Sequence, residues 1–288
     1  MSLKFKKGFT FIEMIVVILI IGILSGVIFT ILIGPMRSYV DVEKRLRLVD
    51  VTDTALQRMT REIRLALPNS IRITAGPTTI EFLRTLDGGR YRAKPGGASS
   101  VCPTSTGGDP VAQDRLNFAM ASDCFQVMGS LSNETKDPMG TCFFDSTPCF
   151  LVIYNTGQLG ANAYSNNNTA TITAADTTGI IGDSITFTGA PPFPYQSPRQ
   201  RFFIVDTPVS FVCNTGANQI TRHDDYTIGG AVGAGNLLVN QVSACDFKYD
   251  PGSASRAGLV SLSITIQDSS LGGGSVTLLQ QAHVDNQP

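Results

Sequence analysis

An uncharged, mostly apolar run of twenty residues, Met14–Ile33, constrains this 288-residue chain more than any other feature. A helix rises about 1.5 Å per residue, so this run spans roughly 30 Å, the thickness of a bilayer's hydrocarbon core. A single acid, Glu13, stands directly before it. A carboxylate at that position costs a few kcal/mol to insert unless something neutralises it, so Glu13 is a candidate functional residue.

Three interpretations of this segment compete. A secretory signal peptide has a shorter apolar core, about 7–15 residues, and a small-residue cleavage site behind it, whereas this core runs into Gly34-Pro35. An ordinary membrane anchor explains the length but not the acid. Cleavage between Gly8 and Phe9 explains both, because it frees an α-amine, with a pKa near 8, four residues before Glu13. Residues i and i+4 of a helix share a face about 6 Å apart, so this amine can neutralise the carboxylate within its own helix or from a neighbouring one.

The stretch Lys6-Lys7-Gly8-Phe9-Thr10-Phe11-Ile12-Glu13, with the apolar helix behind it, resembles the processing site of type IV pilins and of the pseudopilins of type II secretion. The resemblance implies that a prepilin peptidase cuts after Gly8 and N-methylates Phe9. It implies that Glu13 pairs with the terminal amine of an adjacent subunit during assembly. The implied partners are the peptidase, the major and other minor pilins, and an assembly platform in the inner membrane.

The cysteines indicate which side of the membrane holds the large domain, because basic residues flank the apolar run on both sides and leave the charge rule indecisive. All six cysteines follow the apolar run, and no C-x-x-C pair occurs among them. An even number of cysteines in such a domain predicts disulfides in an oxidising compartment. We therefore expect a cytoplasmic leader and a periplasmic head that later stands on a cell-surface pilus. The six are Cys102, Cys124, Cys142, Cys149, Cys213 and Cys245.

Six cysteines allow fifteen connectivities. Short loops close at the least entropic cost, which favours Cys142–Cys149; the sequence neighbours Cys102–Cys124 and Cys213–Cys245 then follow. Zinc is the rival use of cysteine, but it usually needs paired short spacings with nearby histidines. The two histidines, His223 and His283, stand far from any cysteine pair, so we expect no metal.

Composition and motifs point away from catalysis and nucleic acid. The net charge of −1 offers no basic excess, and neither a G-x-S-x-G elbow nor a G-x-x-x-x-G-K-[ST] loop occurs. We expect no cofactor and no enzyme activity. The acidic cluster His223-Asp224-Asp225 is interpreted as a solvated turn instead of a calcium or acid–base site, and His283 as a structural or edge residue. Asn166-Asn167-Asn168 is interpreted as a turn-forming loop, with contact to a sugar as the alternative.

Beyond Pro35 the apolar residues Val42, Leu46, Val49, Leu56, Met59, Ile63 and Leu67 recur at helical spacing. This pattern predicts an amphipathic helix that ends at about Ala66–Leu67, because Pro68 disfavours helical geometry in the residue before it. Gly34-Pro35 should weaken or kink the join between the two helix halves, and Gly22 is a second soft point. We expect the apolar stripe to cover one face of a β-sheet, with a coiled coil to other subunits as the alternative.

From Ser70 onward the period changes to two. Ile71–Ile73, Thr79–Arg84 and Arg90–Arg92, separated by turns at Gly76-Pro77 and Asp87-Gly88-Gly89, read as an antiparallel meander. Further strands are expected at Leu151–Tyr154, Ser184–Thr188, Arg201–Asp206, Val209–Cys213, Leu237–Val242, Cys245–Tyr249, Val260–Gln267 and Val276–His283. Surface loops are expected at Pro95–Gly108, Ala161–Thr178, Ala190–Pro198 and Gly229–Gly235.

The predicted fold class is therefore α+β, with one long N-terminal helix packed on an antiparallel β-rich head. We expect a cleaved leader at 1–8, a transmembrane and assembly helix at 9–35, an amphipathic helix at 36–68, and a head with long loops and disulfides at 69–288.

Two separated stretches, Arg58–Arg72 and Gln280–Pro288, are similar to the MshO-type minor pilins of the MSHA (mannose-sensitive haemagglutinin) pilus. GspJ-type pseudopilins and PilW-type minor pilins share the general plan. The resemblance implies a minor pilin that takes part in pilus assembly or tip formation. A head with several long insertions also suits low copy number better than a regular lattice. The alternatives are a type II secretion pseudopilin, a tip adhesin that binds a carbohydrate or surface through its loops, and a membrane-tethered periplasmic enzyme.

Overall fold

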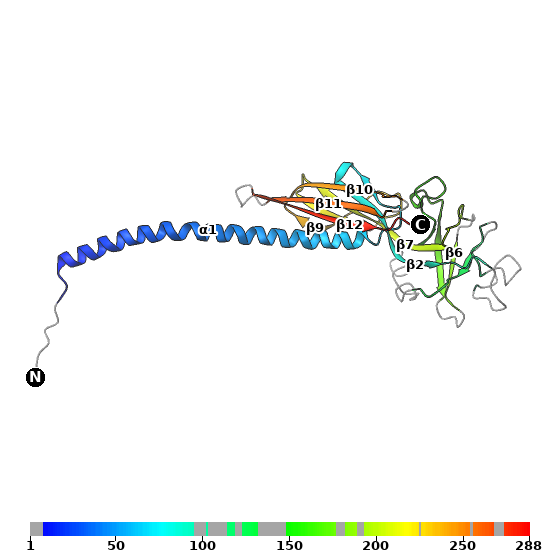
Figure 1. Ribbon diagram of the computed structural model, residues 1–288, viewed down its shortest axis with the longest axis horizontal. Coiled ribbons are helices and arrows are strands. Elements are labelled where there is room, and N and C mark those ends of the chain that lie inside the picture. Colours follow the sequence, from blue (N-terminus) through cyan, green and yellow to red (C-terminus); the bar gives the residue numbers. More distant parts are fainter. Residues whose placement is uncertain are drawn as a thin grey trace, which may run out of the picture.

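The computed structural model describes residues 8–94, 102, 114–118, 123–131, 148–176, 182–188, 193–224, 226–253, 256–267 and 274–288. The leader lysines Lys6 and Lys7, together with Cys142 and Asp225, lie outside these residues, as does nearly all of Pro95–Gly108. One long helix, α1 (Phe11–Ile63), leads into a head built from β-strands (Figure 1). The α+β class predicted from the sequence is confirmed.

Helix α1 runs without interruption for 53 residues. It continues through Gly34 and Pro35 as one gently curved rod, so the kink predicted there is absent (Figure 1). Proline removes one main-chain N–H donor from a helix, but the surrounding turns keep their helical geometry here. Within the described residues, α1 is the one helix long and apolar enough to cross a membrane, and none of its most apolar stretch is buried.

The helix ends at Ile63, a few residues earlier than the proline rule predicts. The chain leaves the helix because it joins the edge of strand β2 (Thr79–Arg90). The N–H of Leu67 donates to the carbonyl of Leu83 at 2.8 Å, and the N–H of Thr85 donates to the carbonyl of Leu65 at 2.8 Å. Pairing with a distant strand thus ends the helix before Pro68 does.

The head contains two antiparallel sheets. The larger has the path β1-β2-β7-β4-β5-β6-β3, with β8 joining β7 to β9, and the smaller has the order β10-β11-β12. The strands are β1 (Arg72–Thr74), β2 (Thr79–Arg90), β3 (Cys124–Gln126), β4 (Phe150–Ile153), β5 (Thr169–Asp176), β6 (Ser184–Thr188), β7 (Arg201–Asn214), β8 (Gln219–His223), β9 (Asn236–Asn240), β10 (Val242–Asp250), β11 (Gly258–Gln267) and β12 (Ser275–Val284); the 3-10 turns are η1 (Gly76–Thr78) and η2 (Ala163–Ser165).

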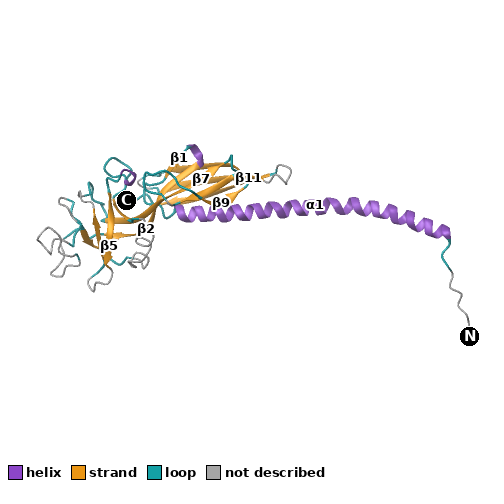
Figure 2. Ribbon diagram, turned by 180° about the vertical axis from the view of Figure 1, so that it is seen from behind, coloured by secondary structure: helices purple, strands orange, loops and turns teal. Residues whose placement is uncertain are grey.

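Two large hydrophobic cores divide the described part of the head into two lobes, and a smaller third cluster, which includes Leu83 of β2 and Val205 of β7, lies on the strands that connect them. The proximal lobe packs the end of α1 against both sheets, and its core includes Leu56, Met59, Phe211 and Leu262. The distal lobe is built from β3 to β6 with the adjoining halves of β2 and β7, and its core includes Phe125 and Phe202. The long strands β2 and β7 run through both lobes and connect them. The distal lobe extends past the C-terminal end of α1 (Figures 1 and 2).

The turn predicted at Asp87-Gly88-Gly89 is wrong, because β2 continues through these residues to Arg90 and pairs with β7. The glycines serve close packing instead of a reversal. A Cβ on Gly88 would lie 3.0 Å from the carbonyl oxygen of Phe202, and a Cβ on Gly89 would lie 3.1 Å from the ring of Phe202. Irregularities in the register between Leu83 and Asp87 let the strand pass from one lobe to the other.

Other strand predictions need similar correction. The tract Ala161–Thr178, expected to be a surface loop, contains β5, which pairs with both β4 and β6 and buries Ala170 and Ile172. The two strands expected at Arg201–Asp206 and Val209–Cys213 form one strand, β7. Strands β3 and β8 were not predicted, because each contributes only a few residues to a large sheet.

The apolar stripe of α1 covers the head only in part. Leu56, Met59 and Ile63 are fully buried in the proximal core, as predicted. Val42 and Leu46, assigned to the same stripe, are 54% and 63% exposed. The interpretation of the whole stripe as sheet-covering is therefore wrong for its first part, since the head begins to cover the helix only near Leu48.

Among the described cysteines, two pairs are disulfide-bonded as expected from their neighbouring positions in the sequence. Cys213–Cys245 joins β7 to β10, and so links the two sheets, with Cα atoms 6.5 Å apart. Cys102–Cys124 anchors the segment before β3, with Cα atoms 5.8 Å apart. Cys149 is also disulfide-bonded; its expected partner, Cys142, lies outside the described residues, so that pairing stays a prediction.

Candidate functional site

The segment before α1 presents the predicted cleavage site openly. Gly8, Phe9 and Thr10 precede the helix in extended or irregular backbone, and the Phe9 side chain is 84% exposed. A Cβ built on Gly8 would meet no atom within 4 Å. Among the described residues, no neighbouring atom therefore crowds Gly8, and the side chain of Phe9 is open to solvent.

Glu13 has a local role that the sequence analysis missed. Thr10 is the N-cap of α1, and its hydroxyl accepts a hydrogen bond from the N–H of Glu13 at 3.4 Å. The Glu13 carboxylate in turn accepts from the N–H of Thr10 at 3.5 Å. This is a capping box, in which threonine and a glutamate three residues later satisfy two main-chain donors at the helix start. The pattern Thr10-x-x-Glu13 was visible in the sequence as its signature.

The capping box changes the geometry expected for the amine and the acid. The helix begins at Phe11, so Phe9 lies outside it, and the i, i+4 arrangement on one helix face does not form here. The Glu13 carboxylate stays on the outer surface of the first turn, where another molecule can reach it.

Side chains across Met14–Ile33 are almost all exposed, as a segment that meets lipid or other helices requires. Within it, the Thr30 hydroxyl donates to the carbonyl of Val27 at 2.8 Å, so its polar group is satisfied inside its own helix. The Thr30 hydroxyl therefore needs no outside partner in lipid.

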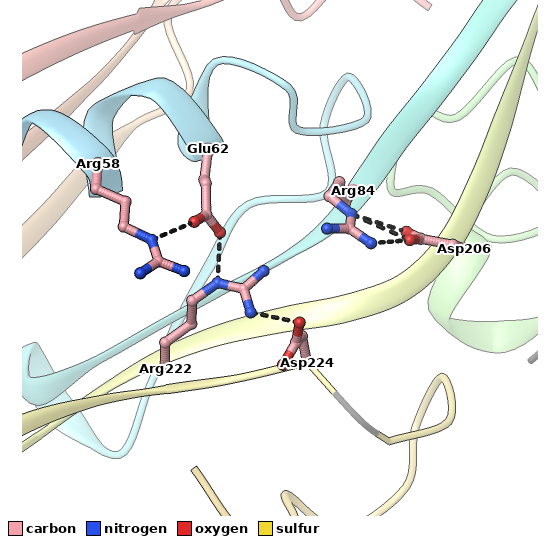
Figure 3. Close-up of polar contacts among 6 residues, drawn as sticks. All are labelled: Arg58, Glu62, Arg84, Asp206, Arg222 and Asp224. Carbon is pink, nitrogen blue, oxygen red and sulfur yellow. Dashed lines mark hydrogen bonds and ion pairs between the residues drawn. The ribbon is translucent and has the colours of Figure 1, made fainter. Parts of the chain in front are cut away.

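An ion network fastens the other end of α1 to the head (Figure 3). Arg222 of β8 donates through Nε to a Glu62 oxygen at 2.6 Å and also pairs with Asp224, while Arg58 bonds the second Glu62 oxygen at 3.1 Å. The Arg222 side chain is only 8% exposed. Its burial opposes the charged form, but the hydrogen bonds to Asp224 and Glu62 outweigh that effect and raise the pKa of Arg222.

A second polar cluster lies where β1, β2 and β7 meet. The buried Glu81 accepts from Arg72 Nε at 2.7 Å and from the Tyr226 hydroxyl at 3.1 Å. The Arg72 guanidinium lies 3.7 Å from the centre of the Tyr164 ring. Burial raises the pKa of Tyr226 and of Tyr164 well above the ordinary phenol value. Every charge in the cluster has a partner, so its role is to hold strands together.

Asparagines join the two stretches, Arg58–Arg72 and Gln280–Pro288, that carry the narrower resemblance. Asn69 Nδ2 donates to the carbonyl of Asn286 at 3.1 Å and to that of Asn155 at 2.8 Å. Asn155 is buried and donates through Nδ2 to the carbonyl of Pro68 at 2.7 Å. The start of the head, the end of β4 and the C-terminal segment therefore meet at one point between the lobes.

Most of the remaining candidate residues from the sequence bind to other groups within the head. Both ring nitrogens of His223 are engaged, with the Thr221 hydroxyl at 2.8 Å and the Gly233 carbonyl at 2.8 Å, and Asp224 pairs with Arg222. Asn168 is buried and donates to the carbonyl of Ile153 at 3.1 Å, so its side chain cannot reach a sugar, whereas Asn166 is exposed at a turn. His283 is exposed on β12, at the edge of the smaller sheet, as expected. Among the described residues, no cluster of histidine, cysteine, aspartate or glutamate could hold a metal ion.

Comparison with known proteins identifies the N-terminal segment. Residues 3–33 match the prokaryotic N-terminal methylation motif. The leader is pilin-like. No curated protein and no solved structure matches the chain. The long apolar helix on an antiparallel β head is consistent with a type IV pilin-like fold, and α1 is long and apolar enough to cross a membrane.

Proposed function

We propose that this chain is a minor subunit of a type IV pilus of the MSHA type, cut after Gly8 by a prepilin peptidase and N-methylated on Phe9. The observation that carries the proposal is the methylation motif at residues 3–33, which includes the exposed apolar first part of α1. In this account the helix waits in the inner membrane with the head in the periplasm. The assembly platform then moves it into a filament of major and other minor pilins.

Glu13 selects and aligns the incoming subunit by pairing with the Phe9 amine of a subunit already in the filament. At about 4 Å and an effective dielectric of about 20, the attraction is on the order of 4 kcal/mol before the cost of desolvation. Because desolvation offsets much of this, the pair contributes register and selection more than net stability. The exposed position of Glu13 on the first turn supports pairing between molecules.

The shape of the head supports a minor role near the filament tip. The distal lobe reaches past the end of α1, away from the membrane segment (Figure 2). A subunit stacked directly above would meet this lobe, whereas a subunit at the tip has nothing above it. The MSHA assignment rests on the two stretches Arg58–Arg72 and Gln280–Pro288, and a GspJ-like pseudopilin is the alternative with the same N-terminus. The neighbouring reading frames distinguish the minor pilin from the pseudopilin. Genes for a pilus beside this one support the minor pilin, and genes for a type II secretion system support the pseudopilin.

The proposal is tested by variants at the N-terminus in the native host. Gly8→Glu should block processing, visible as a retained leader by mass spectrometry, whereas Gly8→Ala should be processed. Glu13→Gln and Glu13→Leu should insert into the membrane normally but enter sheared filaments poorly. Normal incorporation of both Glu13 variants would show that the carboxylate does not direct assembly.

A tip adhesin is the second candidate, favoured by an apolar projection on the head. Leu159 is 92% exposed on the tight turn Gln158–Ala161, beside the half-exposed Tyr195. Deleting Ala161–Thr178 cannot test this idea, because the deletion removes β5 from the sheet. Leu159→Ser with Tyr195→Ser is a better test, with piliation and adhesion scored separately. Normal filaments with reduced adhesion support the adhesin, and unchanged adhesion rejects this surface as its site.

A further inference from the structure

The capping box at the start of α1 determines which peptide groups belong to the helix. Thr10 is the N-cap and has extended backbone, with φ of −82° and ψ of 150°. The N–H of Met14 donates to the carbonyl of Thr10 at 3.2 Å, which closes the first turn of the helix. Gly8 and Phe9 lie before the cap and outside α1. The predicted cleavage site is therefore separated from the helix by a single capping residue.

The cap diverts a donor that a longer helix would use. In a helix that continued toward the N-terminus, the N–H of Ile12 would bond the carbonyl of Gly8, and the N–H of Glu13 would bond that of Phe9. The N–H of Glu13 instead donates to the Thr10 hydroxyl at 3.4 Å. Neither the Gly8 nor the Phe9 carbonyl accepts a main-chain hydrogen bond from a described residue. Within the described part of the chain, the carbonyl of the Gly8–Phe9 bond is therefore not tied into the helix.

The Glu13 carboxylate reinforces this boundary. It accepts from the N–H of Thr10 at 3.5 Å, a donor that a longer helix would pair with a carbonyl four residues earlier. Two main-chain donors are thus satisfied by side chains within the same turn. Serine, threonine, asparagine and aspartate are favoured as N-caps because their side-chain oxygens accept such bonds, whereas valine has no oxygen to offer. The start of α1 at Phe11 therefore depends on the hydroxyl of Thr10.

Cleavage between Gly8 and Phe9 needs this peptide group outside the helix. Water adds across the C–N bond and leaves a carboxylate on Gly8 and an amine on Phe9, so the peptidase has to reach the carbonyl carbon and stabilise its oxygen. A carbonyl inside an α-helix is bonded to an N–H four residues later. Residues 3–33, which match the methylation motif, include both the cleavage site and the cap. A helix that extended back over Gly8 would therefore compete with the peptidase.

We propose that Thr10 is a positioning residue for the cleavage between Gly8 and Phe9. Its hydroxyl makes α1 begin at Phe11 and so keeps the carbonyl of the scissile bond out of the helix, where the peptidase can bind it. Thr10 takes no part in the addition of water and acts only through the conformation of the main chain. The inference rests on the proposed function, because it takes cleavage after Gly8 as its starting point.

The test is cleavage of the full-length chain by the prepilin peptidase of its native host, both in detergent, with mass spectrometry of the released leader. Thr10→Val keeps the branched shape and loses the acceptor oxygen, whereas Thr10→Ser and Thr10→Asn keep a capping oxygen on side chains of different shape. Thr10→Val should lower kcat/KM about fivefold, the factor by which loss of an N-cap typically weakens a helix start, and the other two variants should stay within about twofold of the wild type. The loss should appear in KM with kcat unchanged, because a competing helical conformation reduces the fraction of chains that can bind.

Thr30→Val is the matched control. Thr30 lies in the same helix, and its hydroxyl donates within that helix to the carbonyl of Val27 at 2.8 Å, far from the cleavage site. It should be cleaved like the wild type. The Cα chemical shift of Phe9, measured by NMR on a labelled full-length chain, gives a direct view of the main chain: it should move toward the helical value in Thr10→Val and stay unchanged in Thr10→Ser.

Three results would overturn the proposal. The first is cleavage of Thr10→Val as efficient as that of the wild type. The second is cleavage of Thr10→Asn as slow as that of Thr10→Val, which would show that the peptidase recognises the threonine side chain itself. The third is slowed cleavage of Thr10→Val without a helical shift at Phe9. A wild-type chain that the peptidase leaves intact would contradict the proposed processing instead, so failure of the inference and failure of the proposed function are distinguished.

Discussion

Replacing Arg222 by methionine should lower the free energy of unfolding by about 3 kcal/mol, because it leaves two acids without their shared partner. Arg222 is 8% exposed and Glu62 is 13% exposed, so solvent cannot replace the lost contact fully. Breaking a buried pair typically costs about 3–5 kcal/mol. The lower end applies because Glu62 keeps Arg58, and Asp224, 32% exposed, can be hydrated. Methionine fills most of the space of the arginine stem, so little of the loss comes from a cavity.

Arg58→Met is the matched control, since Arg58 bonds the same Glu62 carboxylate from a side chain that is 50% exposed. An exposed pair contributes about 0–1 kcal/mol. Urea unfolding of the full chain in detergent measures both variants without adding salt, which would screen the charges. Tyrosine fluorescence is the signal, because the chain has seven tyrosines and no tryptophan. The reasoning fails if Arg222→Met costs less than about 1 kcal/mol, or no more than Arg58→Met.

Two further predictions concern the interior of the head. Because the pKa values of Tyr226 and Tyr164 are raised, the folded state holds these protons more tightly than the unfolded state does. The contribution of the two phenols to the free energy of unfolding is therefore complete below about pH 10 and is lost as the pH rises above it. Thermal melts between about pH 8 and 11 should show this loss. Tyr226→Phe should reduce it, whereas Tyr39→Phe on the exposed helix should not, and equal pH profiles for both would contradict the assignment. Gly89→Val should destabilise the distal lobe by about 1–3 kcal/mol, because its side chain would overlap the buried ring of Phe202. An unchanged unfolding midpoint would show that the lobe can yield there.

The sequence predicts the N-terminal half of the architecture well because helix formation there depends on local pattern. The apolar run, its length and the 3.6-residue period specify α1 without reference to the head. Its end does not follow from local pattern, since Ala66 pairs with Arg84 and takes the chain out of the helix before Pro68. Likewise, the helical period places Val42 and Leu46 on the apolar face of α1, but it does not determine whether the head covers that part of the face.

The head is harder to predict because its determinants are far apart in sequence. Asp87-Gly88-Gly89 has turn chemistry, yet those glycines make room for Phe202, more than a hundred residues away. The polar composition of β5 suggested a loop, but two neighbouring strands bury its alternate residues. Contacts such as that of Asn69 with Asn286 join partly buried groups more than two hundred residues apart and leave no local signal.

The sequence singles out Gly8, Phe9 and Glu13 because they belong to one short motif, which lies within the residues that match the methylation motif. Their roles in cleavage, methylation and assembly stay predictions. What the sequence reasoning missed was the capping box between Thr10 and Glu13, although its spacing was readable. Its consequence is spatial: α1 starts at Phe11, so Phe9 and Glu13 do not share a helix face. The pairing of the Phe9 amine with Glu13, within one chain or between neighbouring chains, stays a prediction.

The central claim is that hydrolysis between Gly8 and Phe9 creates an amine that meets an acid at the membrane surface. Mass spectrometry of the N-terminal peptide, from protein purified from its native host, tests it most directly. The account predicts a chain that begins with N-methylated Phe9. A chain that still begins with the initiator Met1, or that starts beyond Ile33, would contradict it.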